Sequence, residues 1–234
     1  MVEVIAGITV SPEIFSVLGA QLVSDPITAL SELIKNSYDA DAENVGLKFL
    51  GGRSGIVVED DGVGMSLDDI RRGWLQIGTP LKRRTSTSPV KRRVLVGSMG
   101  IGRLSAFSIA DTITIQTGHA EDWFEYTISF SDLIGSTSLS DIKIPIRRIP
   151  GVKQHGTIIG LSKLKWWPTE EEINQTRIRL SVLASPTGTK DFSIFLQFDD
   201  SKTPIEPEAN LPSCAYCCRG LNRRKRKNRQ SFEG

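Results

Sequence analysis

Apolar residues recur at helical spacing in the segment that follows Asp25-Pro26. At about 100° per residue, four of them fall on one face: Ile27, Leu30, Ile34 and Tyr38. An aspartate directly before a proline is typical of a helix start. The pattern therefore predicts a helix that runs through "ELIKNSYDADA", residues 32–42, with its apolar face against a core.

Short apolar runs bounded by glycine and polar residues predict strands. The clearest are residues 44–50 and 55–60, a strand pair joined by "GGRS"; the others are residues 112–118, 123–130, 156–162 and 192–198. Further helices are predicted at residues 11–23, after the capping box Ser66–Asp69, and at residues 103–110 and 169–184.

Helices and strands are thus interspersed, with several hairpins. This order favours an α/β chain of the α+β two-layer kind, a mixed, mostly antiparallel sheet with helices on one face, over a doubly wound parallel sheet. We expect one domain over residues 1–200. Residues 201–234 are Pro-rich, then Cys-rich, then basic, and from about Thr203 we expect a tail that leaves the core.

The composition is that of a soluble globular protein, with 39% hydrophobic and 24% charged residues in a chain of 234. No apolar run is long enough to predict a membrane span, and the N-terminus lacks a secretion signal. The three cysteines, Cys214, Cys217 and Cys218, crowd one segment and cannot form a disulfide framework for the body. We therefore expect a cytoplasmic setting.

The net charge of +2 hides an acidic body and a basic tail, "RGLNRRKRKNRQ". The tail is open to two interpretations: contact with nucleic acid or another acidic surface, or a basic tail with no specific role. The neighbouring cysteines would need a fourth ligand from elsewhere to close a zinc site.

The polar face of the predicted helix carries Glu32, Asn36 and Asp39. One interpretation is an ordinary solvated face. The other is a catalytic site, in which Asn36 supplies a neutral oxygen to Mg²⁺ and Glu32, one turn away, polarises a water as a general base. The second interpretation requires a phosphate ligand.

Two glycine motifs supply candidates for that ligand's site. In "VEDDGVGMS", Asp60 ends an apolar strand and precedes Gly62 and Gly64, which indicates either a simple turn or a carboxylate aimed at the edge of adenine. Guanine presents a carbonyl at that edge, which a carboxylate repels. In "GSMGIG", residues 97–102, glycines precede a helix whose N-terminus can approach phosphates, although the motif is not a Walker loop.

These motifs in this order closely resemble the GHKL superfamily of ATPases (gyrase, the heat-shock chaperone, histidine kinases and MutL), over about residues 10–200. The first motif, with Glu32, Asn36, Asp39 and Ala40, is similar to that of the chaperone, MutL and MORC-like branch. The resemblance implies a Bergerat-type ATP-binding fold that uses ATP and Mg²⁺.

By this resemblance Glu32 is the general base, Asn36 the Mg²⁺ ligand and Asp60 the adenine ligand, with Thr157 assisting through water. The rest of the implied nucleotide-binding set is Asp39, Ala40, Gly62, Gly64, Met65, Lys82, Gly97, Gly100, Ile101, Gly102 and Arg103. Met65 would pack on the base, and the glycines of residues 97–102 would line the phosphates.

Residues 78–96 form a long polar segment with six basic residues: Lys82, Arg83, Arg84, Lys91, Arg92 and Arg93. We expect either a lid that closes over phosphates or touches an acidic partner, or a solvated loop. Lys82 and Arg103 are the candidate phosphate contacts.

Three functions remain open from the sequence. The first is slow ATP hydrolysis that drives a conformational switch, with homodimerisation on ATP binding and an unknown partner or client. The second is a nucleotide-gated binding module without significant hydrolysis. The third is a kinase of the same fold, which His119 and His155 do not favour because neither lies on a phosphoacceptor-like helix. The second domain that supplies a lysine in MutL-type relatives has little room after Phe198, so we expect an isolated or truncated module.

Overall fold

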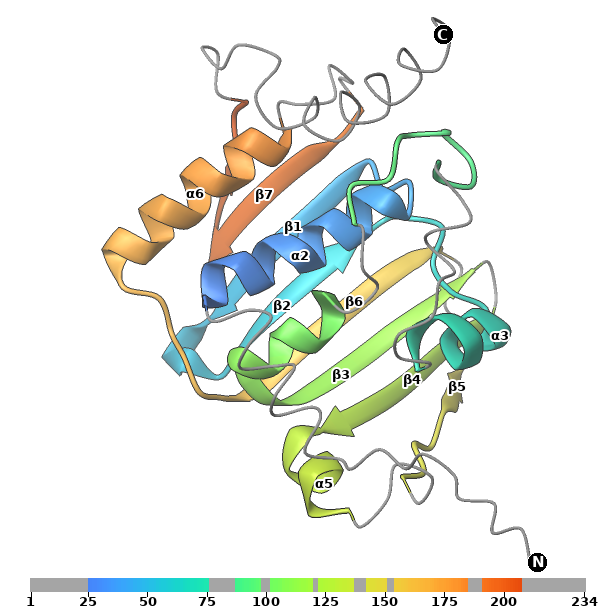
Figure 1. The fold of residues 1–234 in the computed structure, drawn as a ribbon. Coiled ribbons are helices and arrows are strands. Elements are labelled where there is room, and N and C mark those ends of the chain that lie inside the picture. The colour runs from blue at the N-terminus through green and yellow to red at the C-terminus, as the bar shows by residue number, and fades with distance from the viewer. Residues whose placement is uncertain are drawn as a thin grey trace, which may run out of the picture.

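The computed structural model describes residues 25–75, 87–97, 102–119, 122–136, 142–150, 154–184 and 191–207. Eight strands form one sheet in the order β5-β4-β3-β6-β2-β1-β7-β8 (Figure 1). Their bounds are β1 Asn44–Leu50, β2 Gly55–Asp60, β3 Ala110–His119, β4 Asp122–Ser129, β5 Arg147–Ile149, β6 Gly156–Leu164, β7 Ser193–Phe198 and β8 Ser201–Pro204. β1 and β7 pair in parallel and the other neighbours are antiparallel. The mixed, mostly antiparallel sheet is confirmed.

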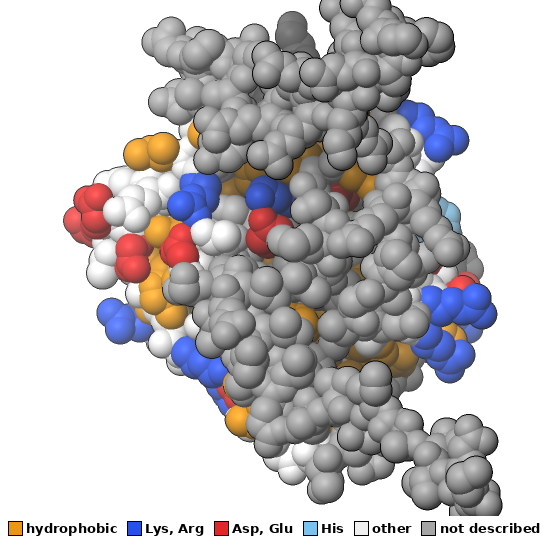
Figure 2. Space-filling view, in the orientation of Figure 1, with side chains coloured by type: hydrophobic (Ala, Val, Ile, Leu, Met, Phe, Trp, Pro, Cys, Tyr) orange, Lys and Arg blue, Asp and Glu red, His pale blue; other side chains and the backbone are white. Residues whose placement is uncertain are grey.

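The larger helices cover one face of this sheet (Figure 1). They are α2 Pro26–Asp39, α6 Glu170–Ala184 and the 3₁₀ helix η3 Gly102–Ser108; shorter turns are η1 Gly51–Arg53, α3 Leu67–Asp69, the π-helical η2 Ile70–Trp74 and α5 Phe130–Gly135. α2 and α6 are joined by an ion pair between Asp25 Oδ2 and Arg179 Nη1 at 2.8 Å. Both acidic and basic side chains are visible on the described part of this face (Figure 2).

α2 begins where the sequence predicts. The Asp25 side chain accepts hydrogen bonds from the backbone N–H groups of Ile27 and Thr28, at 3.0 and 3.2 Å, and Pro26 occupies the first turn. All four residues of the predicted apolar face are buried: Ile27, Leu30, Ile34 and Tyr38. Sequence periodicity thus placed both the start of the helix and its inward face correctly.

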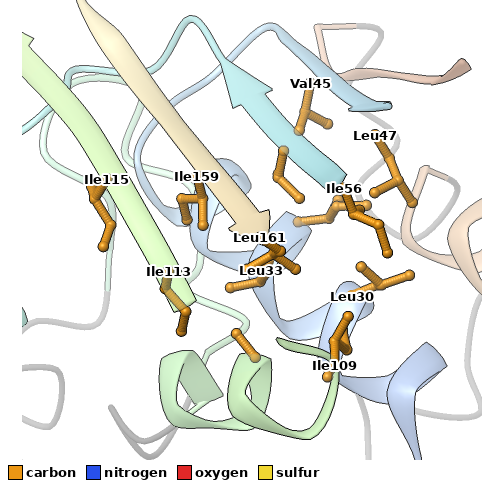
Figure 3. Packing of buried hydrophobic residues seen from close by; sticks show 14 of the residues in the cluster. Leu30, Leu33, Val45, Leu47, Ile56, Ile109, Ile113, Ile115, Ile159 and Leu161 are labelled. Carbon is orange, nitrogen blue, oxygen red and sulfur yellow. The ribbon is translucent and has the colours of Figure 1, made fainter. Parts of the chain in front are cut away.

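The core lies between this helical layer and the sheet. Leu30 and Leu33 of α2 meet aliphatic residues from four strands: Val45, Leu47, Ile56, Ile113, Ile115, Ile159 and Leu161 (Figure 3). Trp167 packs edge-on against Phe49 at a centroid distance of 5.6 Å. A rigid layer of β-branched and leucine side chains therefore fixes the strand ends that carry the polar residues.

The sequence analysis missed the 3₁₀ turn η1, the helix α5 and the strands β5 and β8. β8 pairs with β7, and Ile205 beyond it is buried. β8 and Ile205 therefore belong to the folded body, beyond the position at about Thr203 where we expected the tail to begin, and residues 208–234 lie outside the described residues. The predicted helix of residues 103–110 is the 3₁₀ helix η3, and the predicted helix of residues 11–23 lies outside the described residues.

Candidate functional site

Asp60 is the last residue of β2, and two donors fix its carboxylate. The Ser37 hydroxyl donates to Oδ2 at 2.7 Å, and the Gly62 N–H donates to Oδ1 at 3.0 Å. Burial raises the pKa of Asp60 to about 6, against the lowering effect of the hydrogen bonds from Ser37 and Gly62. A half-buried acceptor held in one orientation suits recognition of a ligand N–H group.

Thr157 and Thr117 complete this end of the site. Thr157 of β6 is the register partner of Asp60, and its hydroxyl lies 3.0 Å from that of Thr117 on β3. The Thr117 hydroxyl also accepts the Met65 N–H at 3.1 Å. The structure therefore brings together Asp60, Thr157 and Met65, which the sequence analysis selected.

Ser37 and Thr117 were missed by that analysis. Ser37 directly follows Asn36 in the helix, and its position beside the apolar face was the only signal available. Thr117 lies among alternating residues of an ordinary strand, so only the antiparallel register of β3 and β6 shows its role.

The turn after Asp60 needs its glycines. Gly64 has φ +68°, and a Cβ there would collide with the backbone carbonyl of Gly118. A Cβ on Gly62 would lie 2.7 Å from the carbonyl oxygen of Ala40, and that oxygen also accepts the Val63 N–H at 2.8 Å. Ala40 thus contributes through its backbone.

Glu32 and Asn36 are half-buried neighbours on α2, one turn apart. The Glu32 carboxylate forms an ion pair with Lys35 Nζ at 2.6 Å, and both side chains are 26% exposed. The sequence analysis did not consider Lys35. Glu32 is thus accessible, and its carboxylate is held by a flexible side chain that can move away.

Asp39 has a definite structural task. Its two carboxylate oxygens accept the backbone N–H groups of Val96 and Gly97, at 2.8 and 3.1 Å. The side chain is buried rather than solvated. Asp39 therefore anchors the start of the "GSMGIG" segment beside α2.

The rest of the predicted phosphate loop is described only in part. Lys82, Gly100 and Ile101 lie outside the described residues, and Gly102 and Arg103 are described by their backbone at the start of η3. Among the described residues of this loop, Gly97 is held in place by the hydrogen bond from its N–H to the Asp39 side chain.

Two basic residues of the expected lid are structural. The Arg93 guanidinium is buried, donating to the Ala42 carbonyl at 2.7 Å and to Asp191 Oδ2 at 2.8 Å. Lys91 Nζ lies 2.8 Å from Glu43 and 3.0 Å from Asp191. These contacts fasten the second half of the segment to the body, so neither cation belongs to a solvated loop or is directed at a phosphate.

Arg92 is exposed, whereas Lys82, Arg83 and Arg84 lie outside the described residues. Within the described ranges, no three His, Cys, Asp or Glu residues are grouped so that they could hold a metal ion. None of the helices in the described ranges has the length and apolar character needed to cross a bilayer.

Comparison with known proteins matches the segment that carries these residues. A family model described as "Histidine kinase-, DNA gyrase B-, and HSP90-like ATPase" matches residues 24–157. The putative type II restriction enzyme HgiDII of Herpetosiphon aurantiacus is 35% identical over 94 residues, which cover 40% of this chain and 15% of that protein. The DNA mismatch repair protein MutL of Rhizorhabdus wittichii is 30% identical over 121 residues, covering 51% of this chain and 20% of that protein.

Proposed function

The chain belongs to the histidine kinase-, DNA gyrase B- and HSP90-like ATPase family, and from this premise we propose that it binds ATP with Mg²⁺ and hydrolyses it slowly. The observation that carries the proposal is the half-buried Asp60 carboxylate, held by Ser37 and Gly62 beside Thr157. A family member built to bind an adenine nucleotide needs such an acceptor in a fixed orientation.

Adenine recognition follows from the chemistry of this acceptor. The ionised Asp60 accepts from the exocyclic amine of adenine, and the Thr157 hydroxyl assists through a water. Met65, held through its backbone by Thr117, packs on the base. GTP is rejected because the guanine carbonyl would face the carboxylate and leave it without a donor.

In this proposal the triphosphate of the bound nucleotide lies beside the polar face of α2. Bound Mg²⁺ supplies positive charge that offsets the phosphate charge. Asn36 contributes an amide oxygen to it, Gly97 approaches the phosphates from its anchor on Asp39, and Glu32 orients and deprotonates the attacking water. For Glu32 to do so, Lys35 must release its carboxylate.

A paired measurement tests the assignment: ATP affinity and steady-state hydrolysis for the wild type, Glu32→Ala and Asp60→Asn. Glu32→Ala is expected to retain binding and to lose turnover by about 100-fold or more, since general-base catalysis contributes roughly 10²–10⁴-fold. Asp60→Asn is expected to lose binding. Hydrolysis by Glu32→Ala at the wild-type rate would contradict the base, and normal ATP binding by Asp60→Asn would contradict the pocket.

The same measurement separates the alternatives. Binding by the wild type without release of phosphate would favour a nucleotide-gated binding module, and phosphate transferred to a protein would favour a kinase. Glu32 favours hydrolysis, because a pure sensor has no need of a general base.

The chain spans no more than a fifth of the length of the relatives described above. We therefore propose that it is a switch module whose nucleotide state acts on an attached or separate partner. Both relatives carry names of DNA-processing proteins, so we propose a nucleic-acid-processing system as the setting.

A further inference from the structure

The chain contains two histidines, and both contact the same turn of the candidate site. His155 directly precedes β6, and its Nδ1 lies 2.8 Å from the Gly62 carbonyl oxygen. His119 is the last residue of β3, and its Nδ1 lies 3.2 Å from the Val63 carbonyl oxygen. Residues 61–64, here called the adenine turn, are thus contacted by one imidazole at the end of β3 and by another just before β6.

The two carbonyl acceptors determine which nitrogen of each imidazole carries a proton. A carbonyl oxygen only accepts, so in both contacts Nδ1 carries the proton and donates. An imidazole has this Nδ1–H in one neutral tautomer and also in the cation. The two contacts therefore fix the tautomer and are available in either charge state.

The same turn is bound from its inner side. The Gly62 N–H donates to Asp60 Oδ1, and the Val63 N–H donates to the Ala40 carbonyl. Amides thus point inward and carbonyls point outward to the histidines. The Gly62 carbonyl and the Val63 N–H belong to one peptide, so a rotation that released His155 would also break the hydrogen bond from Val63 to the Ala40 carbonyl. It would thereby displace Gly62, whose own N–H donates to the Asp60 carboxylate.

Close packing leaves the turn little freedom except rotation of its peptides. A Cβ on Gly64 would collide with the Gly118 carbonyl, and one on Gly156 would collide with the Asp60 carbonyl. Gly118 and Gly156 are the chain neighbours of His119 and His155. The backbone contacts set the distance between the turn and the strands, and the imidazoles set the orientation of its peptides.

We propose that His155, assisted by His119, is a positioning residue that fixes the adenine turn and through it the orientation of the Asp60 carboxylate. The inference rests on the proposed function. The histidines act on the base end of the nucleotide, so their loss affects ATP and ADP equally, narrows the preference for ATP over GTP, and leaves the rate at saturating ATP unchanged.

The test is calorimetric titration of the full chain with ADP and with ATP, together with kcat and KM. His155→Ala is expected to weaken both nucleotides by about three- to tenfold, the range for one hydrogen bond between neutral groups, and to raise KM with kcat unchanged. His119→Ala is expected to act in the same direction and less strongly, because its contact is longer.

Two conservative variants distinguish positioning from general structural damage. The amide nitrogen of an asparagine sits near the position of Nδ1, so His155→Asn is expected to restore affinity to within about twofold. A glutamine amide extends toward the position of Nε2, so His155→Gln is expected to remain weak. If His155→Ala proves unstable in thermal unfolding, the comparison of the Asn and Gln variants still decides the question.

Wild-type affinity in His155→Ala would overturn the inference, as would equal affinities for the Asn and Gln variants or a loss confined to kcat. A wild-type chain that binds neither ADP nor ATP would overturn the proposed function instead.

Discussion

Asp60 must be ionised to accept a hydrogen bond from adenine, yet its burial favours the protonated form. Burial raises its pKa from 3.8 to about 6, so the folded protein holds this proton more tightly than the unfolded chain. The contribution of Asp60 to the free energy of unfolding is therefore greatest below about pH 4 and is lost as the pH rises through 6. At pH 7 the ionised carboxylate lowers stability by an amount on the order of 3 kcal/mol.

Asp60→Asn is accordingly expected to stabilise the nucleotide-free protein while it removes ATP binding. We expect the free energy of unfolding at pH 7 to rise by about 1–3 kcal/mol, and the gain to shrink as the pH falls below 6. Urea unfolding between pH 4 and pH 8 measures both effects.

The neighbouring Asp61 is the matched control. Burial acts against it too, but hydrogen bonds from Asn44 and the Glu43 backbone outweigh that effect and lower its pKa. Asp61→Asn is therefore expected to destabilise the protein at pH 7. A destabilising Asp60→Asn would show that the buried charge of Asp60 is compensated.

At the level of single residues, the sequence predicted those site residues that belong to a recognisable motif. Asp60 after an apolar strand and Asn36 on a helix were selected because their motifs occur together in the order that resembles the GHKL superfamily. Ser37, Thr117 and the histidines carry no such signal. Their roles depend on pairings between segments far apart in the chain, which spacing cannot show.

α2 contacts both the Asp60 end of the candidate site, through Ser37, and the Gly97 end, through Asp39. Its polar face carries the residues of the first motif. At its C-terminal end, Asp39, Asp41 and the Tyr38 carbonyl accept hydrogen bonds from the segment of residues 87–97. The Arg93 guanidinium also lies over the Tyr38 ring, 4.8 Å from its centroid. The sequence of this segment predicts a polar loop, but the structure packs part of it against the folded body.

Arg93→Met is expected to lower the free energy of unfolding by about 2–4 kcal/mol, because it removes the buried guanidinium that donates to the Asp191 carboxylate and to the backbone carbonyls of Tyr38, Ala42 and Asp191. It should also weaken ATP binding, since Val96 and Gly97 follow directly. Thermal unfolding and nucleotide titration measure these effects.

The control for this prediction is Arg92→Ala. Arg92 is adjacent and exposed, so its replacement is expected to change stability by no more than about 0.5 kcal/mol. Equal effects of the two variants would contradict the structural role of Arg93.

The sequence could not predict this arrangement because six basic residues in an aperiodic stretch are typical of a solvated loop. Helix and strand positions were predicted better, since the periodicity of α2 and the apolar runs of β1, β2 and β6 reflect burial directly. β5 and β8 are short edge strands with little apolar pattern of their own.

At the scale of the whole molecule, the described side chains visible in Figure 2 include both acidic and basic groups. The sequence gathers seven Lys and Arg residues and no Asp or Glu within residues 219–229. We therefore expect the basic segment of residues 219–229 to provide the phosphate contacts in the proposed setting.

Duplex DNA is expected to change the steady-state ATPase rate of the full chain by at least about twofold in low salt, and the effect should fade as salt rises because counterion release drives such contacts. A chain with Arg223, Arg224, Lys225, Arg226 and Lys227 replaced by glutamine is the control and should not respond. A rate that is independent of DNA at every salt concentration would contradict the nucleic-acid setting.

The pairing of β1 with β7 has a consequence for how the chain is made. Asn44 faces Ser193, so β1 is synthesised long before the strand that covers its outer edge. At roughly 5–20 residues per second, the β1–β2 hairpin waits on the order of ten seconds on the ribosome with that edge unpaired. Its apolar residues Val45, Leu47 and Phe49 are open to non-native strand pairing during that interval. Slowing translation between β2 and β7 should therefore lower the yield of folded protein, whereas slowing it after β8 should not.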